Sequence, residues 1–433
     1  SATWLDRHRF ESAFGRKGIA DVGVDEPAHV AVVGWLSRFE HEHDYVAYIA
    51  DPTDTAWTQR CLRQADRVYL VARAASNPDP SDLERRIVGH VPPERLQLVL
   101  VHEPEVDRPS GTDRWLEGRT VSRHHHVRRG EQASVRRLAR RISGDTVGVV
   151  FSGGGARGFA HGGVARAIAE TETPVDLMFG TSMGALVSAK VLLDGWEAFA
   201  ESAARFARRR EIVDYTLPIS AIASSRRVTG LLERLYGDVR IEDLWLPWFS
   251  VSTNLSEART DVTSSGLLRD AVRASISIPG VFSPVARGGD LIVDGGVMNN
   301  MPVDLARTVG GAGHVIAINA SPRKERSRRH EFADQASGWR LFWSNVIPGL
   351  TAERVPPLGM TLMRALDVNS AQRTRELRPA ADVMIAPDTS GFGVLEWESH
   401  ARLLDIGYEA GMRALAEGLP IGPGAKAPMS SRP

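Results

Sequence analysis

A serine between two glycines, Ser182 in Gly180–Gly184 (GTSMG), has the surroundings of a catalytic nucleophile. A second glycine-rich turn, Gly153–Gly158 (GGGARG), lies just upstream. Each turn follows a short apolar run, 147–151 or 177–179, and precedes a helical pattern. Glycines let the backbone turn sharply and lift a serine hydroxyl clear of a sheet. The pattern therefore predicts that Ser182 stands at a strand-to-helix turn as a reactive hydroxyl.

The upstream turn predicts an oxyanion hole beside this serine. Gly153, Gly154 and Gly155 are successive glycines at the expected start of a helix, where backbone N–H groups bind an anion readily. Each such donor contributes about 3–4 kcal/mol to the transition state of acyl transfer. Arg157 either fixes this loop or binds a phosphate on the substrate, and a structural salt bridge is an equally good interpretation.

A serine hydroxyl needs a nearby base. The histidine candidates are His161, His314 and His400. His161, on the helix after the glycine turn, is interpreted as structural. Asp294 is the stronger candidate because it follows the apolar run 291–293 and precedes two glycines. A partly desolvated carboxylate there accepts the serine proton directly. Taken alone, Asp294 would be interpreted as a turn or capping residue.

Dinucleotide binding is a competing interpretation of the first turn. Gly153, Gly155 and Gly158 also fit the pattern G-x-G-x-x-G between a strand and a helix. A dinucleotide site needs an acidic residue at the carboxyl end of the next strand. Asp176 instead precedes the strand 177–179. This interpretation therefore lacks its acid.

The elements that must position these residues alternate between strands and helices. In the second part of the chain, strands are expected at 147–151, 177–179, 248–252, 291–293, 314–319 and 383–385, with helices at 159–170 and 185–193. In the first part, strands are expected at 44–50, 67–72 and 96–102, with helices at 55–64 and 81–88. This alternation predicts the α/β class with parallel sheets.

The chain is expected to divide into several parts. These are an N-terminal segment of loop and irregular helix (1–29), a small α/β domain without catalytic signature (30–118), a basic connector (119–145), a catalytic domain (146–420) and a disordered tail (421–433). The small domain has no G-x-x-x-x-G-K-[ST] motif, which argues against nucleotide hydrolysis. His124–His126 is interpreted as part of a solvated basic face, because neighbouring side chains diverge and three in a row suit a metal poorly.

Composition excludes several classes of function. The formal net charge is zero, so nothing global indicates nucleic acid. Cys61 is the sole cysteine, which excludes intrachain disulfides and a cysteine metal site. No apolar stretch approaches the roughly 18 residues of a spanning helix, and no signal peptide is visible. A basic run at 323–330 before an aromatic stretch at 339–347 favours a membrane surface; a core helix with a solvated basic loop is the alternative.

The three motifs together resemble the patatin-like phospholipase family, whose members hydrolyse lipid esters with a serine–aspartate dyad. Further segments are similar to the neuropathy target esterase subfamily, as in a bacterial member: 57–66, 124–126, 241–245, 251–253, 271–279 and 294–304. The resemblance extends from about residue 30 to about residue 415.

By this resemblance, Ser182 is the nucleophile and Asp294 the base, and the oxyanion loop consists of Gly153, Gly154, Gly155 and Arg157. The resemblance implies a three-layer α/β/α hydrolase domain, preceded here by the smaller parallel α/β domain. It also implies deacylation of lysophospholipids or phospholipids without metal or organic cofactor. With the basic and aromatic segments, we expect a cytoplasmic, peripherally membrane-associated protein. Larger members place cyclic-nucleotide-binding-like domains upstream, and none is seen in this sequence. Acyl transfer to another acceptor, a non-hydrolytic lipid-sensing module and a homo-oligomer stay open.

Overall fold

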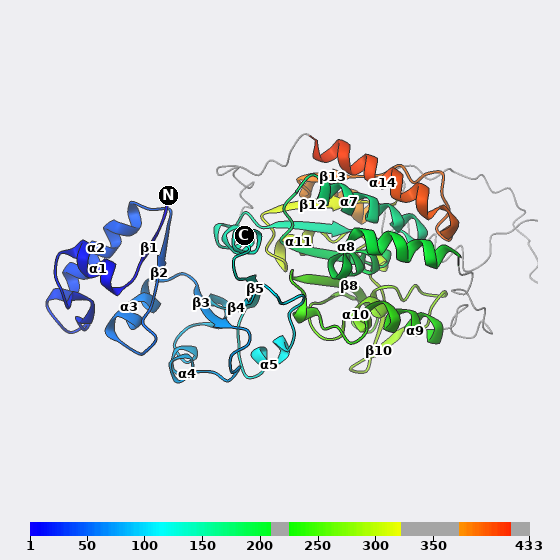
Figure 1. The fold of residues 1–433 in the computed structure, drawn as a ribbon. Helices are drawn as coiled ribbons and strands as arrows, with labels where there is room; N and C mark the ends of the chain where they lie inside the picture. Colours follow the sequence, from blue (N-terminus) through cyan, green and yellow to red (C-terminus); the bar gives the residue numbers. More distant parts are fainter. Residues whose placement is uncertain (209–224, 322–371, 417–433) are drawn as a thin grey trace, which may run out of the picture. The chain divides into compact units, whose positions relative to one another are not determined.

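The computed structural model describes residues 1–208, 225–321 and 372–416, which form two compact units. The units are Ser1–Glu131 and Gln132–Pro433, drawn in Figure 1. Their boundary falls inside the stretch 119–145 that the sequence suggests as a connector. The basic run 323–330, the aromatic stretch 339–347 and the tail 421–433 lie outside the described residues.

The first unit contains two small parallel sheets with helices around them. Its elements are β1 (Ala2–Leu5), α1 (Arg7–Phe14), α2 (Ala28–His41), β2 (Tyr45–Tyr48), α3 (Ala56–Gln64), β3 (Val68–Arg73), α4 (Asp82–Val88), β4 (Leu96–His102), α5 (Thr112–Leu116) and β5 (Arg123–Arg128). Strand β1 pairs with β2, and the other sheet has the order β3-β4-β5. The expectation of loop and irregular helix at the start is wrong, because Leu5 and Phe10 pack with Trp57 in one core.

The histidine run does not lie on a solvated face, contrary to the expectation from its sequence. It belongs to β5, which pairs with the buried strand β4. His126 is 4% exposed, and its Nδ1 lies 2.9 Å from Nε2 of His102. His125 turns to Gln97, with 2.7 Å between Nε2 and Oε1. The alternation of side chains along a strand thus separates neighbouring histidines.

The second unit is built on one eight-stranded sheet. Its strands are β6 (Val147–Phe151), β7 (Leu177–Thr181), β8 (Trp248–Asn254), β9 (Arg259–Thr263), β10 (Val285–Arg287), β11 (Asp290–Asp294), β12 (His314–Ile318) and β13 (Val383–Ile385). Its α-helices are α6 (Gln132–Ser143), α7 (Ala160–Glu170), α8 (Met183–Arg208), α9 (Ser225–Tyr236), α10 (Leu268–Ser275), α11 (Val303–Thr308) and α14 (His400–Leu415). The order is β10-β11-β8-β7-β6-β12-β13, with β9 on β8. Strands β9, β10 and β11 make antiparallel pairs, and the others are parallel.

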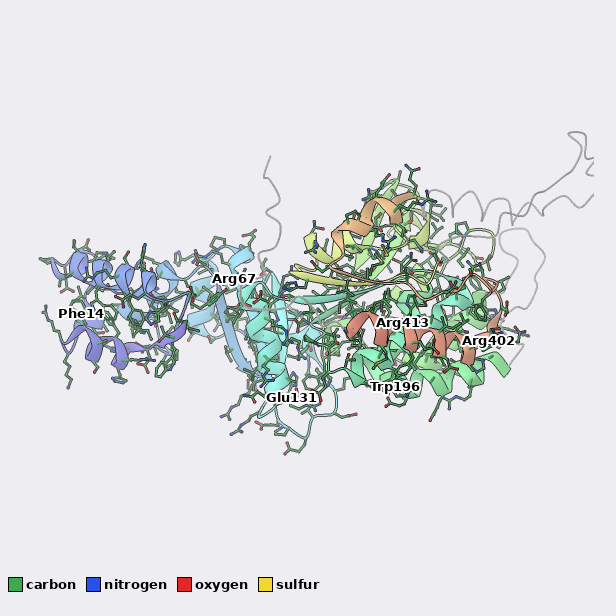
Figure 2. All side chains as sticks on the ribbon, turned by 90° about the horizontal axis from the view of Figure 1, so that it is seen from above. Phe14, Arg67, Glu131, Trp196, Arg402 and Arg413 are labelled. Carbon is green, nitrogen blue, oxygen red and sulfur yellow. The ribbon has the colours of Figure 1, made fainter. Side chains whose placement is uncertain are left out.

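Two cores lie on opposite faces of this sheet. Alternate side chains of β6 enter them: Val149 packs with α7, α8, α10 and α14, whereas Val150 packs with α11. A strand sends successive side chains to opposite faces, so an all-apolar strand such as β6 needs helices on both sides. A sheet with helices on both of its faces (Figures 1 and 2) confirms the expected α/β class and its three layers.

Strand register brings the two glycine turns together. Phe151 at the end of β6 pairs with Gly180 in β7, and Thr181 pairs with Val251 of β8. The turn after β6 and the turn after β7 therefore leave the same edge of the sheet side by side, as the carboxyl ends of parallel strands do.

Candidate active site

Ser182 occupies a strained turn between β7 and α8. Its φ is +54°, a left-handed conformation that is uncommon for a residue with a side chain. The side chain is directed at Asp294: Ser182 Oγ donates a hydrogen bond to Asp294 Oδ2 at 2.5 Å. Both residues are buried, with 7% and 5% of their surface exposed. The structure thus brings the predicted nucleophile and the predicted base into direct contact.

Asp294 reaches this position through strand register. Strand β11 runs antiparallel to β8, and Asp294 lies opposite Ser252, close to the end of β7. Its Oδ1 accepts a hydrogen bond from the Gly296 N–H at 2.7 Å, which leaves Oδ2 to Ser182. Its own N–H donates to the Ser277 carbonyl at 3.0 Å. The carboxylate is therefore oriented on both sides before any substrate binds.

The carboxyl end of α10 holds both members of the pair. Ser275, the last residue of α10 and fully buried, accepts a hydrogen bond from the Ser182 N–H at 2.9 Å. Its hydroxyl donates in turn to the Val251 carbonyl on β8 at 2.6 Å. Two residues later, Ser277 supplies the carbonyl that holds the Asp294 N–H. Sequence reasoning did not single out Ser275, because it lies 93 residues from Ser182 and outside any nucleophile motif.

The first glycine turn lies against the nucleophile. A Cβ on Gly153 would lie 3.1 Å from the Cβ of Ser182 and 2.3 Å from Oδ1 of Asn300, so a side chain there would displace Asn300 and crowd Ser182. Gly155 has a φ of +57°, and a Cβ on it would lie 2.5 Å from the Val394 carbonyl oxygen. Both positions favour glycine for conformation or close approach.

The amides of this turn are not equivalent. Gly153 donates its N–H to the Asn300 carbonyl at 3.1 Å. Within the described ranges, the N–H groups of Gly154 and Gly155 donate to no protein acceptor. Arg157 donates its Nε–H to the Phe392 carbonyl at 2.8 Å, which ties the turn to a distant segment. Two adjacent N–H groups beside Ser182 are therefore available to an anion.

Neither Asp176 as the acid of a dinucleotide site nor His161 as the base for Ser182 has the necessary geometry. Asp176 lies at the amino end of β7, where its carboxylate accepts from Arg140 at 2.6 Å and from the Val147 N–H at 2.8 Å. It therefore serves as a structural anchor, and no acid follows β7 to hold a ribose. His161 is fully buried, and its Nε2 lies 2.8 Å from the Ser152 carbonyl. Burial lowers the pKa of His161 to about 4, so the ring is neutral and supports the glycine turn.

A cavity lies along α8 and α9. Its volume is about 640 Å³. Phe159, which ends the 3-10 turn Gly155–Phe159, and Met183, which follows Ser182 in the chain, both line it. The buried part of its lining is apolar and comprises Phe159, Met183, Phe199, Ala203 and Val228. Such a cavity accommodates an apolar chain.

Among the described residues, no three His, Cys, Asp or Glu side chains gather where they would hold a metal ion. None of the helices that the structure describes has both the length and the hydropathy needed to cross a bilayer.

Comparison with known proteins gives two family matches in succession. The family described as "Patatin-like phospholipase" matches residues 149–307. The family described as "Neuropathy Target Esterase family P-loop like domain" matches residues 3–148. The first match contains Ser182, Asp294 and the glycine turn; the second covers the first unit. The chain therefore contains a patatin-like phospholipase domain, preceded by a P-loop-like domain of the neuropathy target esterase family.

Two relatives are similar to most of this chain. "Patatin-like phospholipase domain-containing protein 6" of Mus musculus is 31% identical over 426 residues, which cover 90% of this chain and 31% of that protein. "Lysophospholipase nte1" of Neosartorya fischeri is 29% identical over 440 residues, 88% of this chain and 29% of that protein. The two domains together are those of the neuropathy target esterase type. The chain spans about a third of the length of these relatives.

Among solved structures, VipD from Legionella pneumophila aligns over 63% of this chain and 67% of its own. The sequence identity is 14% and the TM-score 0.33, a likeness that carries no argument about function.

Proposed function

We propose that this chain is a serine esterase that removes the fatty acyl chain from lysophospholipids. The contact of Ser182 Oγ with Asp294 Oδ2, at 2.5 Å in a buried site, carries the proposal. A hydroxyl hydrogen-bonded to an oriented carboxylate beside unoccupied N–H donors is the arrangement that acyl transfer needs. The patatin-like phospholipase domain and the printed name of the Neosartorya relative support the same reaction.

In the acylation step, Asp294 takes the proton of the Ser182 hydroxyl as Oγ attacks the ester carbonyl carbon. The carbonyl oxygen becomes an oxyanion, which accepts hydrogen bonds from the N–H groups of Gly154 and Gly155. Collapse of this intermediate breaks the bond to the glycerol oxygen, which receives the proton from Asp294. The products of this step are the deacylated headgroup and an ester between Ser182 and the fatty acid.

In the deacylation step, water attacks the same carbonyl carbon from the side vacated by the glycerol oxygen. Asp294 takes one proton from the water and returns it to Ser182 Oγ as the acyl bond breaks. The fatty acid leaves, and the hydrogen bond between Ser182 and Asp294 forms again. One carboxylate thus serves as base and acid in each half of the cycle.

The volume of the cavity is sufficient for one acyl chain. A saturated chain of about 16 carbons needs about 480 Å³ at roughly 30 Å³ per carbon, the volume that one water takes in the liquid. The cavity beside Met183 measures about 640 Å³, which accommodates the single chain of a lysophospholipid.

The experiment combines a fluorophosphonate probe with fatty acid release from palmitoyl lysophosphatidylcholine. The wild-type chain is expected to be labelled and to release palmitate, and Ser182→Ala to do neither. Ser264→Ala, at an exposed serine outside the cavity lining, is the control and keeps both. If the chain is labelled by the probe but transfers palmitate to an added alcohol or lipid and not to water, it is an acyltransferase. An unlabelled wild-type chain that still binds lysophospholipid would indicate a lipid-sensing module and contradict the proposal.

We also propose that the chain acts in the cytoplasm as a peripheral membrane protein. The support comes from the sequence of residues 323–347, where a basic run precedes Trp339, Phe342 and Trp343. Liposome flotation of a variant with all three aromatic residues replaced by alanine tests this proposal. Membrane binding equal to that of the wild type would contradict it.

A further inference from the structure

Among the described residues, the lining of the cavity beside Met183 carries charge of one sign only. These residues include no Asp or Glu, and the cations among them are Lys190, Arg205, Arg226, Arg227 and Arg234. The four arginines are exposed, whereas the apolar lining residues are mostly buried. Lys190 is paired with Asp194 on its own helix. The mouth of the cavity is therefore cationic and its interior apolar.

Helix α9 presents two of these arginines on one face. Arg226, Gly230 and Arg234 all line the cavity and follow one another at intervals of four residues, which places them on the same side of a helix. A Cβ on Gly230 would lie 3.9 Å from Nη1 of Arg234, so the guanidinium lies back along the helix over this glycine. In the described part of the chain, no carboxylate lies within 4.0 Å of Arg226 or Arg234. Both charges are thus available to a ligand.

We infer that this cavity mouth binds the phosphate of a lysophospholipid whose headgroup is anionic, such as one with a phosphoglycerol headgroup. The inference rests on the proposed esterase function and adds a headgroup preference to it. Guanidinium groups bind phosphate oxygens through paired N–H donors. In the inferred arrangement, the acyl chain lies in the apolar interior beside Met183, the residue after Ser182, and the headgroup lies at the exposed arginines of the mouth.

The same lining disfavours a quaternary ammonium headgroup. Choline binds to aromatic faces or to carboxylates, and the described residues of the mouth offer neither: they include no acid, and the aromatic residues Phe159 and Phe199 are 2% exposed in the interior. In a zwitterionic headgroup, the arginines attract the phosphate and repel the quaternary ammonium group. The net preference is therefore for an anionic headgroup over both a zwitterionic and a neutral one.

The test compares three palmitoyl esters as monomers below their micellar concentrations: lysophosphatidylglycerol, lysophosphatidylcholine and monopalmitoylglycerol. For the wild type, kcat/KM is expected to be about tenfold higher for lysophosphatidylglycerol than for monopalmitoylglycerol, and to fall with added salt because the cations are exposed. In Arg226→Gln/Arg234→Gln, that preference is expected to shrink to less than about twofold while monopalmitoylglycerol is cleaved as before. The control Arg375→Gln/Arg413→Gln removes the same charge from exposed positions away from the cavity (Arg413 is labelled in Figure 2) and keeps the preference.

The outcomes separate this inference from the function on which it rests. Equal kcat/KM for all three esters in the wild type, or an unchanged preference in the Arg226/Arg234 variant, would overturn the headgroup site and leave the esterase intact. A higher value for lysophosphatidylcholine than for lysophosphatidylglycerol would also overturn it. If the wild type cleaves none of the three esters and is not labelled by fluorophosphonate, the proposed function itself fails. Weakening of lysophosphatidylglycerol cleavage by inorganic phosphate, without effect on monopalmitoylglycerol, would support the site and show that phosphate alone binds there.

Discussion

Replacement of Ser275 by alanine removes one hydroxyl that never touches the substrate, yet it is expected to slow the reaction. The Ser275 hydroxyl accepts from the Ser182 N–H at 2.9 Å and donates to the Val251 carbonyl at 2.6 Å. Without it, the buried amide of a residue at φ +54° has no acceptor. Leaving a buried donor unsatisfied costs about 1–3 kcal/mol. If the turn relaxes to recover that cost, Oγ moves away from Asp294, and kcat is expected to fall about 10- to 100-fold.

The assay is palmitate release with kcat and KM measured separately, together with the rate of fluorophosphonate labelling. Ser275→Ala is expected to lower kcat and the labelling rate by the same factor, with KM nearly unchanged. Ser275→Thr keeps the hydroxyl and is expected to recover part of the rate. Ser277→Ala is the matched control: it removes an equally buried hydroxyl that bonds to Arg273 and not to Ser182. Normal labelling of Ser275→Ala, or an equal loss in Ser277→Ala, would refute the reasoning.

Three further predictions follow from the site. Asp294→Asn keeps the shape but loses the base, so kcat is expected to fall by about 10²- to 10⁴-fold at unchanged melting temperature, and near-normal turnover would exclude Asp294 as the base. Burial lowers the pKa of His161 to about 4, so below pH 6.5 the unfolded chain binds a proton that the folded chain does not bind. The free energy of unfolding is therefore expected to fall by up to roughly 3 kcal/mol as the pH drops from 6.5 to 4. Urea titrations should show a shallower fall for His161→Gln. Gly153→Ala places a methyl group 2.3 Å from Asn300 Oδ1 and should abolish labelling, whereas Gly391→Ala, where no atom lies within 4 Å, should leave it unchanged.

The sequence predicted the parts of the site that depend on local pattern. The run 147–151 is strand β6 with the same bounds, and the elbow after 177–179 follows β7, which extends to Thr181. Both are short apolar runs that end in glycine-rich turns, and such signals are contained within about ten residues. Ser182 and the glycine turn were therefore identifiable without any knowledge of the sheet.

The parts that depend on long-range register were not predictable in the same way. Asp294 was selected because it ends a strand, but its place beside Ser182 comes from the antiparallel pairing of β11 with β8. The strands Arg259–Thr263 and Val285–Arg287 were missed, since they lie at the margins of the sheet and are partly polar. Ser275 had no local signal, because its role exists only once α10 packs beside the elbow. Tertiary contacts of this kind leave no periodic trace in one sequence.

The central claim is that Ser182 carries the acyl group during turnover. The most direct measurement is acid quenching of the chain within milliseconds of mixing with palmitoyl lysophosphatidylglycerol, followed by peptide mass spectrometry. A palmitoyl ester is expected on the peptide that contains Ser182, to accumulate faster than free palmitate appears, and to be absent from Ser182→Ala. Steady release of palmitate with no acyl group on that peptide, or with the group on another residue, would contradict the account.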